Sequence, residues 1–105
     1  MIRPLLLALM LVLPACTTGG LNIAALVDPA EAQRRGAVEV AVKSAFPGIL
    51  DEVEAGIGPN LSRALDAARV PAGDRPARLI QLRGDLPLYE ANPSALVTAL
   101  MLYGR

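Results

Sequence analysis

The stretch NPSALVTALMLYG, residues 92–104, contains no charged side chain and is apolar around most of a helical circumference. Asn92 followed by Pro93 is a typical helix start, because asparagine caps the first turn and proline suits the first helical position. Gly104 predicts the end of that helix. A helix that is apolar on all sides is buried or membrane-associated, and about eleven residues fall well short of the ~20 that span a bilayer. We therefore expect residues 93–103 to form a central helix covered by the others, or to be buried against a partner or a second copy.

Proline, glycine and capping residues divide the preceding chain into further short helices. Asp28, Asn60 and Asp74 each stand where a side chain can cap a helix that begins there. The short helices and tight connections predict an all-α fold, a small compact bundle of about four to five helices. The expected helices are residues 28–45, 47–55, 60–69, 74–83 and 93–103, with one helical turn within 85–91.

Residues 37–43 allow a second interpretation of the first helix. From Val38 to Lys43 apolar and polar residues alternate as in a strand, and β-branched valine favours that state. A helix is favoured because Asp28 and Pro29 form a strong start and alanine is abundant on both sides. An α+β fold with a short strand near residues 37–43 is the alternative.

The first residues of the chain have the layout of a secretory signal peptide. Arg3 supplies a positive start, an uncharged apolar run follows over residues 5–13, and the only cysteine, Cys16, comes soon after. Leu13 stands three residues before this cysteine and Ala15 immediately before it. The segment resembles the signal of bacterial lipoproteins, whose lipobox has leucine, a small residue and an obligatory cysteine at these positions.

The resemblance implies cleavage between Ala15 and Cys16 and a lipid anchor on the cysteine, with acyl chains such as palmitate. Thr17, rather than aspartate, follows the cysteine, which implies an outer-membrane anchor facing the periplasm. The alternative is a conventional signal cleaved near Gly19, although no Ala-x-Ala-like site is well placed there. The implied organisation is a signal peptide at 1–15, the lipidated cysteine and a tether at 16–27, and a single helical domain at 28–105.

Composition narrows the chemistry that the domain can perform. Histidine is absent, so the commonest general base and metal ligand is missing. A lipidated Cys16 cannot serve as a nucleophile, and no phosphate-binding loop is present. The formal net charge is zero and aromatic residues are scarce, which argues against binding nucleic acid. We expect no enzyme, cofactor or metal site.

Two groups of charged residues are candidate binding sites. Asp51, Glu52 and Glu54 could hold a divalent cation, but Glu52 points away from the helical face that the other two share. Arg75, Arg78 and Arg83 could bind an anion such as a lipid phosphate or a peptidoglycan carboxylate. For both groups, a solvated helix surface is the simpler interpretation.

The sequence therefore predicts a membrane-anchored lipoprotein of the bacterial cell envelope that acts by binding or scaffolding. Its partners would be membrane lipid through Cys16, and an envelope protein or a second copy through the apolar helix at 93–103. A small carrier of lipid or another apolar ligand is the alternative. A hydrolase that uses only carboxylates, with Asp51 or Glu54, is the least favoured function.

Overall fold

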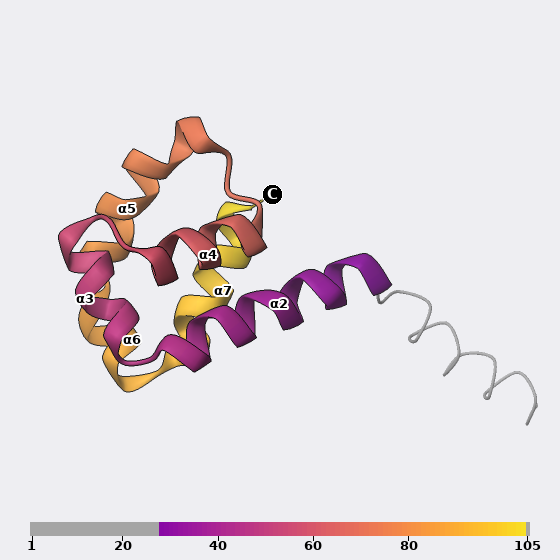
Figure 1. The fold of residues 1–105 in the computed structure, drawn as a ribbon, viewed down its shortest axis with the longest axis horizontal. Coiled ribbons are helices and arrows are strands. Elements are labelled where there is room, and N and C mark those ends of the chain that lie inside the picture. Colours follow the sequence, from indigo (N-terminus) through magenta and orange to yellow (C-terminus); the bar gives the residue numbers. More distant parts are fainter. Residues whose placement is uncertain (1–27, 105) are drawn as a thin grey trace, which may run out of the picture. The chain divides into compact units, whose positions relative to one another are not determined.

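The computed structural model describes residues 28–104, and this range contains six α-helices and one short 3₁₀ helix. No strand occurs among these residues, which confirms the all-α prediction. The helix count exceeds four to five because the expected turn near residue 88 is a helix of its own. The elements are α2 (Pro29–Ala45), α3 (Gly48–Ala55), α4 (Pro59–Ala68), η1 (Ala72–Asp74), α5 (Arg75–Gly84), α6 (Leu86–Ala91) and α7 (Pro93–Tyr103) (Figure 1).

Helix α2 includes residues 37–43, so the alternative of a strand there is wrong. Val38, Ala41 and Val42 are buried, while Val40 between them is 69% exposed. Burial thus repeats every three to four residues, as on a helix, and not every second residue, as on a strand. The start of α2 is as predicted, since the Asp28 carboxylate accepts a hydrogen bond from the Ala30 amide at 3.0 Å.

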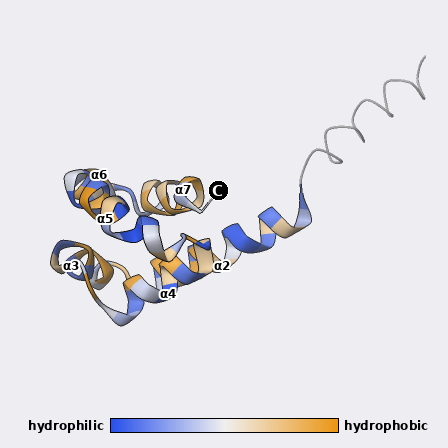
Figure 2. Cartoon of the chain, turned by 90° about the horizontal axis from the view of Figure 1, so that it is seen from above, coloured by the Kyte–Doolittle hydropathy of each residue, from blue (hydrophilic) through white to orange (hydrophobic). Residues whose placement is uncertain are grey.

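Helix α7 supplies a large part of the core of the compact unit formed by residues 32–105. It contacts α4, α5 and α6, and its ribbon is coloured almost throughout as hydrophobic in Figure 2. Its start is as predicted, because the Asn92 side chain accepts a hydrogen bond from the Ser94 amide at 3.1 Å. Only one face of the helix is covered by the other elements, and its four buried residues are Leu96, Val97, Leu100 and Met101.

Glu52, and not Asn60, caps the start of α4. One oxygen of the Glu52 carboxylate accepts hydrogen bonds from the amides of Asn60 (2.9 Å) and Leu61 (3.2 Å), and the other accepts one from the Asn60 side chain (2.8 Å). The predicted cap is wrong because α4 begins one residue earlier, at Pro59. Gly58 makes this contact possible, since a Cβ there would collide with the Glu52 side chain.

The predicted cap at Asp74 is also wrong. Its backbone already has a helical conformation, with φ −89° and ψ −17°, and its side chain makes no capping hydrogen bond. The preceding residues form the 3₁₀ turn η1, in which the Asp74 amide donates to the Pro71 carbonyl at 3.0 Å. A capping side chain needs an extended backbone at its own residue, which η1 prevents.

Arg34 links α2 to the C-terminal parts of α4 and α7. This side chain of α2 is 9% exposed and donates hydrogen bonds to the Ala68 carbonyl at the end of α4 (2.6 Å) and the Met101 carbonyl in α7 (3.2 Å). Gly104, which ends α7 as predicted, lies so close that a Cβ would collide with the Ala68 carbonyl. The glycine is needed here for close approach and not for its backbone conformation, since its φ is −83°.

Candidate functional site

An apolar groove lies between α6 and α7 on the face of α7 that the core leaves uncovered. Its volume is about 390 Å³. Leu88 on α6 is 54% exposed and Leu102 on α7 is 56% exposed. We call this surface the α6–α7 groove, and none of the residues that line it is charged: Leu88, Tyr89, Asn92, Ser94, Ala95, Thr98, Ala99 and Leu102.

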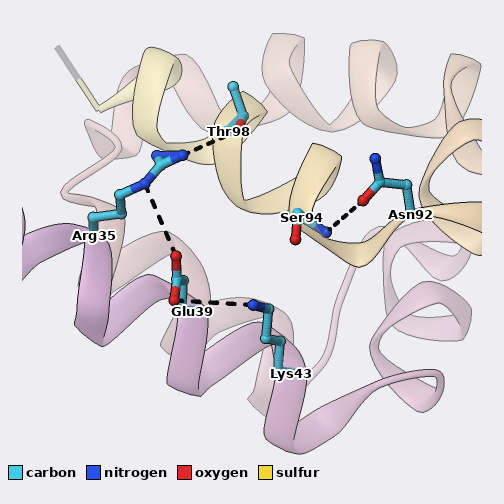
Figure 3. A network of polar contacts seen from close by, with 6 residues as sticks. All are labelled: Arg35, Glu39, Lys43, Asn92, Ser94 and Thr98. Atoms are coloured by element: carbon cyan, nitrogen blue, oxygen red, sulfur yellow. Dashed lines mark hydrogen bonds and ion pairs between the residues drawn. The ribbon is translucent and has the colours of Figure 1, made fainter.

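The local sequence positions both walls of this groove. Asn92 is the single residue between α6 and α7, and its side chain caps α7 (Figure 3). Its backbone amide donates back to the carbonyls of Leu88 (3.0 Å) and Tyr89 (3.2 Å), which ends α6. So short a connection holds the two helices in contact, with the small side chains of Ala95 and Ala99 in the hollow.

Tyr89 is the buried polar residue of the α6–α7 groove. Burial, together with smaller contributions from the nearby Tyr103 and Asp85, raises the pKa of its phenol to about 12. The phenol is therefore uncharged at neutral pH and does not act as a general base there. Together with the uncharged lining, this makes the groove suited to an apolar occupant with a few hydrogen-bonding groups.

A network of exposed polar groups borders α7 on the side of α2. Arg35 donates a hydrogen bond to the Thr98 hydroxyl at 3.4 Å and lies 3.9 Å from the Glu39 carboxylate, which in turn lies 3.9 Å from the Lys43 ammonium group (Figure 3). Glu39 and Lys43 are four residues apart and therefore lie on the same face of α2. Long, solvent-exposed ion pairs of this kind contribute little to stability.

The acidic residues of α3 have different surroundings. Among residues 28–104 no group of three metal-ligating side chains comes together. Asp51 and Glu54 are exposed, as expected of a solvated surface, whereas Glu52 is partly buried against the start of α4. Burial raises the Glu52 pKa, but the hydrogen bonds from Asn60 and Leu61, together with the charge of Arg63, outweigh it and bring the pKa below its ordinary value.

The three arginines of the candidate anion site have different neighbours. Arg75 donates to the Asp66 carboxylate at 2.8 Å and to the Val70 carbonyl at 3.0 Å. Arg78 lies over the ring of Tyr103, 4.5 Å from its centroid, and donates to Gln81 at 3.0 Å. The guanidinium of Arg83 lies beside Gly56. Arg75 and Arg78 thus contact other residues of the domain, and these contacts stabilise the fold.

A second groove lies between α2 and α4 and has a volume of about 470 Å³. We call it the α2–α4 groove. Its lining is small and apolar except for two polar residues, Ser44 and Arg63, and consists of Gly36, Ala37, Val40, Ala41, Ser44, Arg63 and Ala67. No sequence pattern indicates this groove, because its two walls come from helices that are separated along the chain by α3.

The remaining predicted site residues, Ala15 and Cys16, lie outside the residues that the structure describes. Within residues 28–104, no helix has both the length and the hydropathy needed to cross a membrane.

Comparisons with known proteins do not assign the chain to a family. No protein-family model matches it, no curated protein matches it, and no solved structure matches its fold.

Proposed function

We propose that this chain is a lipoprotein of the bacterial cell envelope, anchored through Cys16 in the outer membrane and facing the periplasm, whose helical domain binds another protein. The anchor is supported by Leu13, Ala15 and Cys16 behind the apolar run at residues 5–13. Each buried methylene of an acyl chain contributes ~0.8 kcal/mol, and two chains already hold a protein stably. Acylation of Cys16 would therefore keep the domain at the membrane.

The observation that carries the binding role is the exposure of two leucines beside an uncharged groove. Leu88 and Leu102 leave more than half of their surface open to solvent at the α6–α7 groove. A contiguous apolar surface rimmed by polar groups is typical of interaction sites. Here Asn92, Ser94 and Thr98 would form the polar rim around the leucines and alanines. The occupant that fits is an apolar helix of an envelope protein.

Replacement of the anchor cysteine tests the localisation. In Cys16→Ser the sulfur that would carry lipid is lost, so the protein should move from the membrane fraction to the soluble fraction. Metabolic labelling with an alkyne fatty acid should mark the wild type and not the variant. Membrane fractionation of the unlabelled variant would contradict the proposal.

A charge placed in the α6–α7 groove tests the binding role. Cells would carry the full chain with a photo-crosslinking residue at position 98, where Thr98 is exposed beside the groove. Leu102→Asp should abolish the crosslinked product because it buries an unpaired charge in the interface. Ile80→Asp is the matched control, since Ile80 is 67% exposed on α5 and lines neither groove.

The outcome of this experiment identifies the class of partner. A product that contains a different envelope protein supports the proposal. A product that contains only two copies of the chain assigns the groove to self-association, and equal crosslinking in both aspartate variants contradicts a role for the groove.

A further inference from the structure

The α2–α4 groove is open because the residues along its floor are small. Gly36 has no neighbouring atom within 4 Å of the position that a Cβ would occupy, and Ala37 next to it is exposed. Ala41 is buried beneath the groove, and Val40 beside it is 69% exposed. The resulting volume of about 470 Å³ lies within the range of roughly 300–1,000 Å³ that is usual for small-molecule sites.

Arg63 on α4 is the only charged residue that lines this groove. Within residues 28–104 its side chain makes no hydrogen bond and no ion pair, although its charge helps to lower the Glu52 pKa. Arg75 pairs with Asp66 and Lys43 lies near Glu39, whereas Arg69 and Arg83 also make no ion pair among these residues but line neither groove. An exposed arginine with no side-chain partner among the described residues therefore lies at the edge of the apolar groove.

The second polar residue of the groove is already satisfied. The Ser44 hydroxyl donates to the Val40 carbonyl in the same helix at 2.5 Å. The groove thus offers apolar walls and a single free positive group. A guanidinium binds a carboxylate through two parallel hydrogen bonds, which suits it to an anionic head group.

We propose that the α2–α4 groove binds a free long-chain fatty acid, with the alkyl chain over Ala37 and Val40 and the carboxylate on Arg63. This is a second site, which goes beyond the binding of a protein at the α6–α7 groove and does not depend on it. The alkyl chain covers the exposed side of Val40, and the carboxylate supplies the partner that Arg63 lacks within the described residues.

The charge of Arg63 argues against a second copy of the chain as the occupant. Two copies that pack groove to groove about a twofold axis present the same surface to each other. Two Arg63 side chains would then meet in an interface of low polarity, where like charges repel strongly. An anionic amphiphile satisfies both the apolar walls and the positive edge.

The test uses the full chain, held in nanodiscs of phosphatidylcholine. The probe is palmitic acid with a photoreactive diazirine in its chain, and the control compound has the same chain with a trimethylammonium head group. Peptide mapping after illumination should place the fatty-acid label on α2 and α4 residues that line the groove. The ammonium compound should label them weakly, because it meets Arg63 with a like charge.

Variants separate the role of charge from that of shape. Arg63→Gln should weaken fatty-acid binding roughly tenfold, the loss expected for one charge-assisted contact, while Arg63→Lys should retain most of it. Arg83→Gln, which removes the same charge from α5, should bind as the wild type. Ala37→Leu fills the groove from an exposed position and should reduce labelling by both compounds.

Three results would overturn the proposal. They are equal labelling by the two compounds, unchanged fatty-acid binding in Arg63→Gln, and a label confined to the α6–α7 groove. Crosslinks between two copies through position 40 that persist when the fatty acid is present would assign the groove to self-association instead.

Discussion

The two faces of α7 are both uncharged, and each carries leucine, but their surroundings differ. On one face, Leu100 is completely buried in the core, and on the other face Leu102 is 56% exposed at the α6–α7 groove. The two residues are of the same type and only two positions apart. What separates them is the helical period, which places residues two apart on different sides of the helix. Hydropathy alone thus identifies α7 as apolar, and the packing of its neighbours decides which side becomes a surface.

Two neighbouring arginines of α2 show the same contrast in their polar contacts. Arg34 is buried and binds the Met101 carbonyl on the covered side of α7, whereas Arg35 is exposed and binds the Thr98 hydroxyl on the other side. When a buried carbonyl loses its hydrogen-bond donor, no water molecule can replace that donor. When an exposed hydroxyl loses its donor, water can take its place. The two faces should therefore differ in their contribution to stability as well as in their function.

The largest expected effect comes from truncating a leucine on each face. Leu100→Ala removes a fully buried side chain and should lower the free energy of unfolding by about 3 kcal/mol, through lost burial and the cavity left behind. Leu102→Ala should cost less than ~1 kcal/mol because the side chain is already half in water. Urea unfolding followed by circular dichroism measures both. Equal losses would show that the outer face is also covered.

The arginine pair provides the next test. Arg34→Ala leaves the Ala68 and Met101 carbonyls without this donor and should lower the free energy of unfolding by about 2 kcal/mol. Arg35→Ala breaks only exposed contacts and should cost less than ~0.5 kcal/mol. The same unfolding measurement compares them. A larger loss in Arg35→Ala would place the main link between α2 and α7 on the solvent side.

The smallest expected effect comes from two glutamates of α3, of which one is hydrogen-bonded to α4 and the other is exposed to solvent. Glu52→Ala removes the cap of α4 and should cost about 1 kcal/mol at neutral pH, whereas Glu54→Ala, an exposed control, should cost little. The Glu52 pKa is lower in the folded protein than its ordinary value. The folded protein therefore binds this proton less readily than the unfolded chain does.

The sign of the pH dependence follows from that difference. The contribution of Glu52 is fully present above its ordinary pKa and is lost as the pH falls through the lower folded pKa. The difference in stability between the wild type and Glu52→Ala should consequently shrink on acidification. Unfolding curves recorded from neutral to acidic pH measure it, and a difference that grows would contradict the capping role of the charged carboxylate.

The helices were predictable because their starts and ends are local. Asp28 and Asn92 cap α2 and α7 through contacts within two residues, which a sequence pattern can indicate. The cap from Glu52 to α4 was not predictable, since its partners lie eight and nine residues away, across a turn. The close approach at Gly58 could have suggested it, but proline and glycine there indicate a turn in any case.

The burial of Arg34 could have been expected from its position in the sequence. It precedes the buried Val38 by four residues and Ala41 by seven, so it lies on the apolar face of α2. A charged residue on such a face is either paired or a partner of backbone groups. The identity of those groups could not be predicted, because the ends of α4 and α7 meet α2 only in the folded domain.

By itself, the sequence determined the helical class and the extent of most helices, because each depends on residues close together along the chain. The tertiary structure alone decided which face of α7 stays open, which carbonyls Arg34 binds, and that Arg63 stands beside a hollow of small residues. Those features depend on how separate helices pack, and packing brings together residues that no local pattern connects.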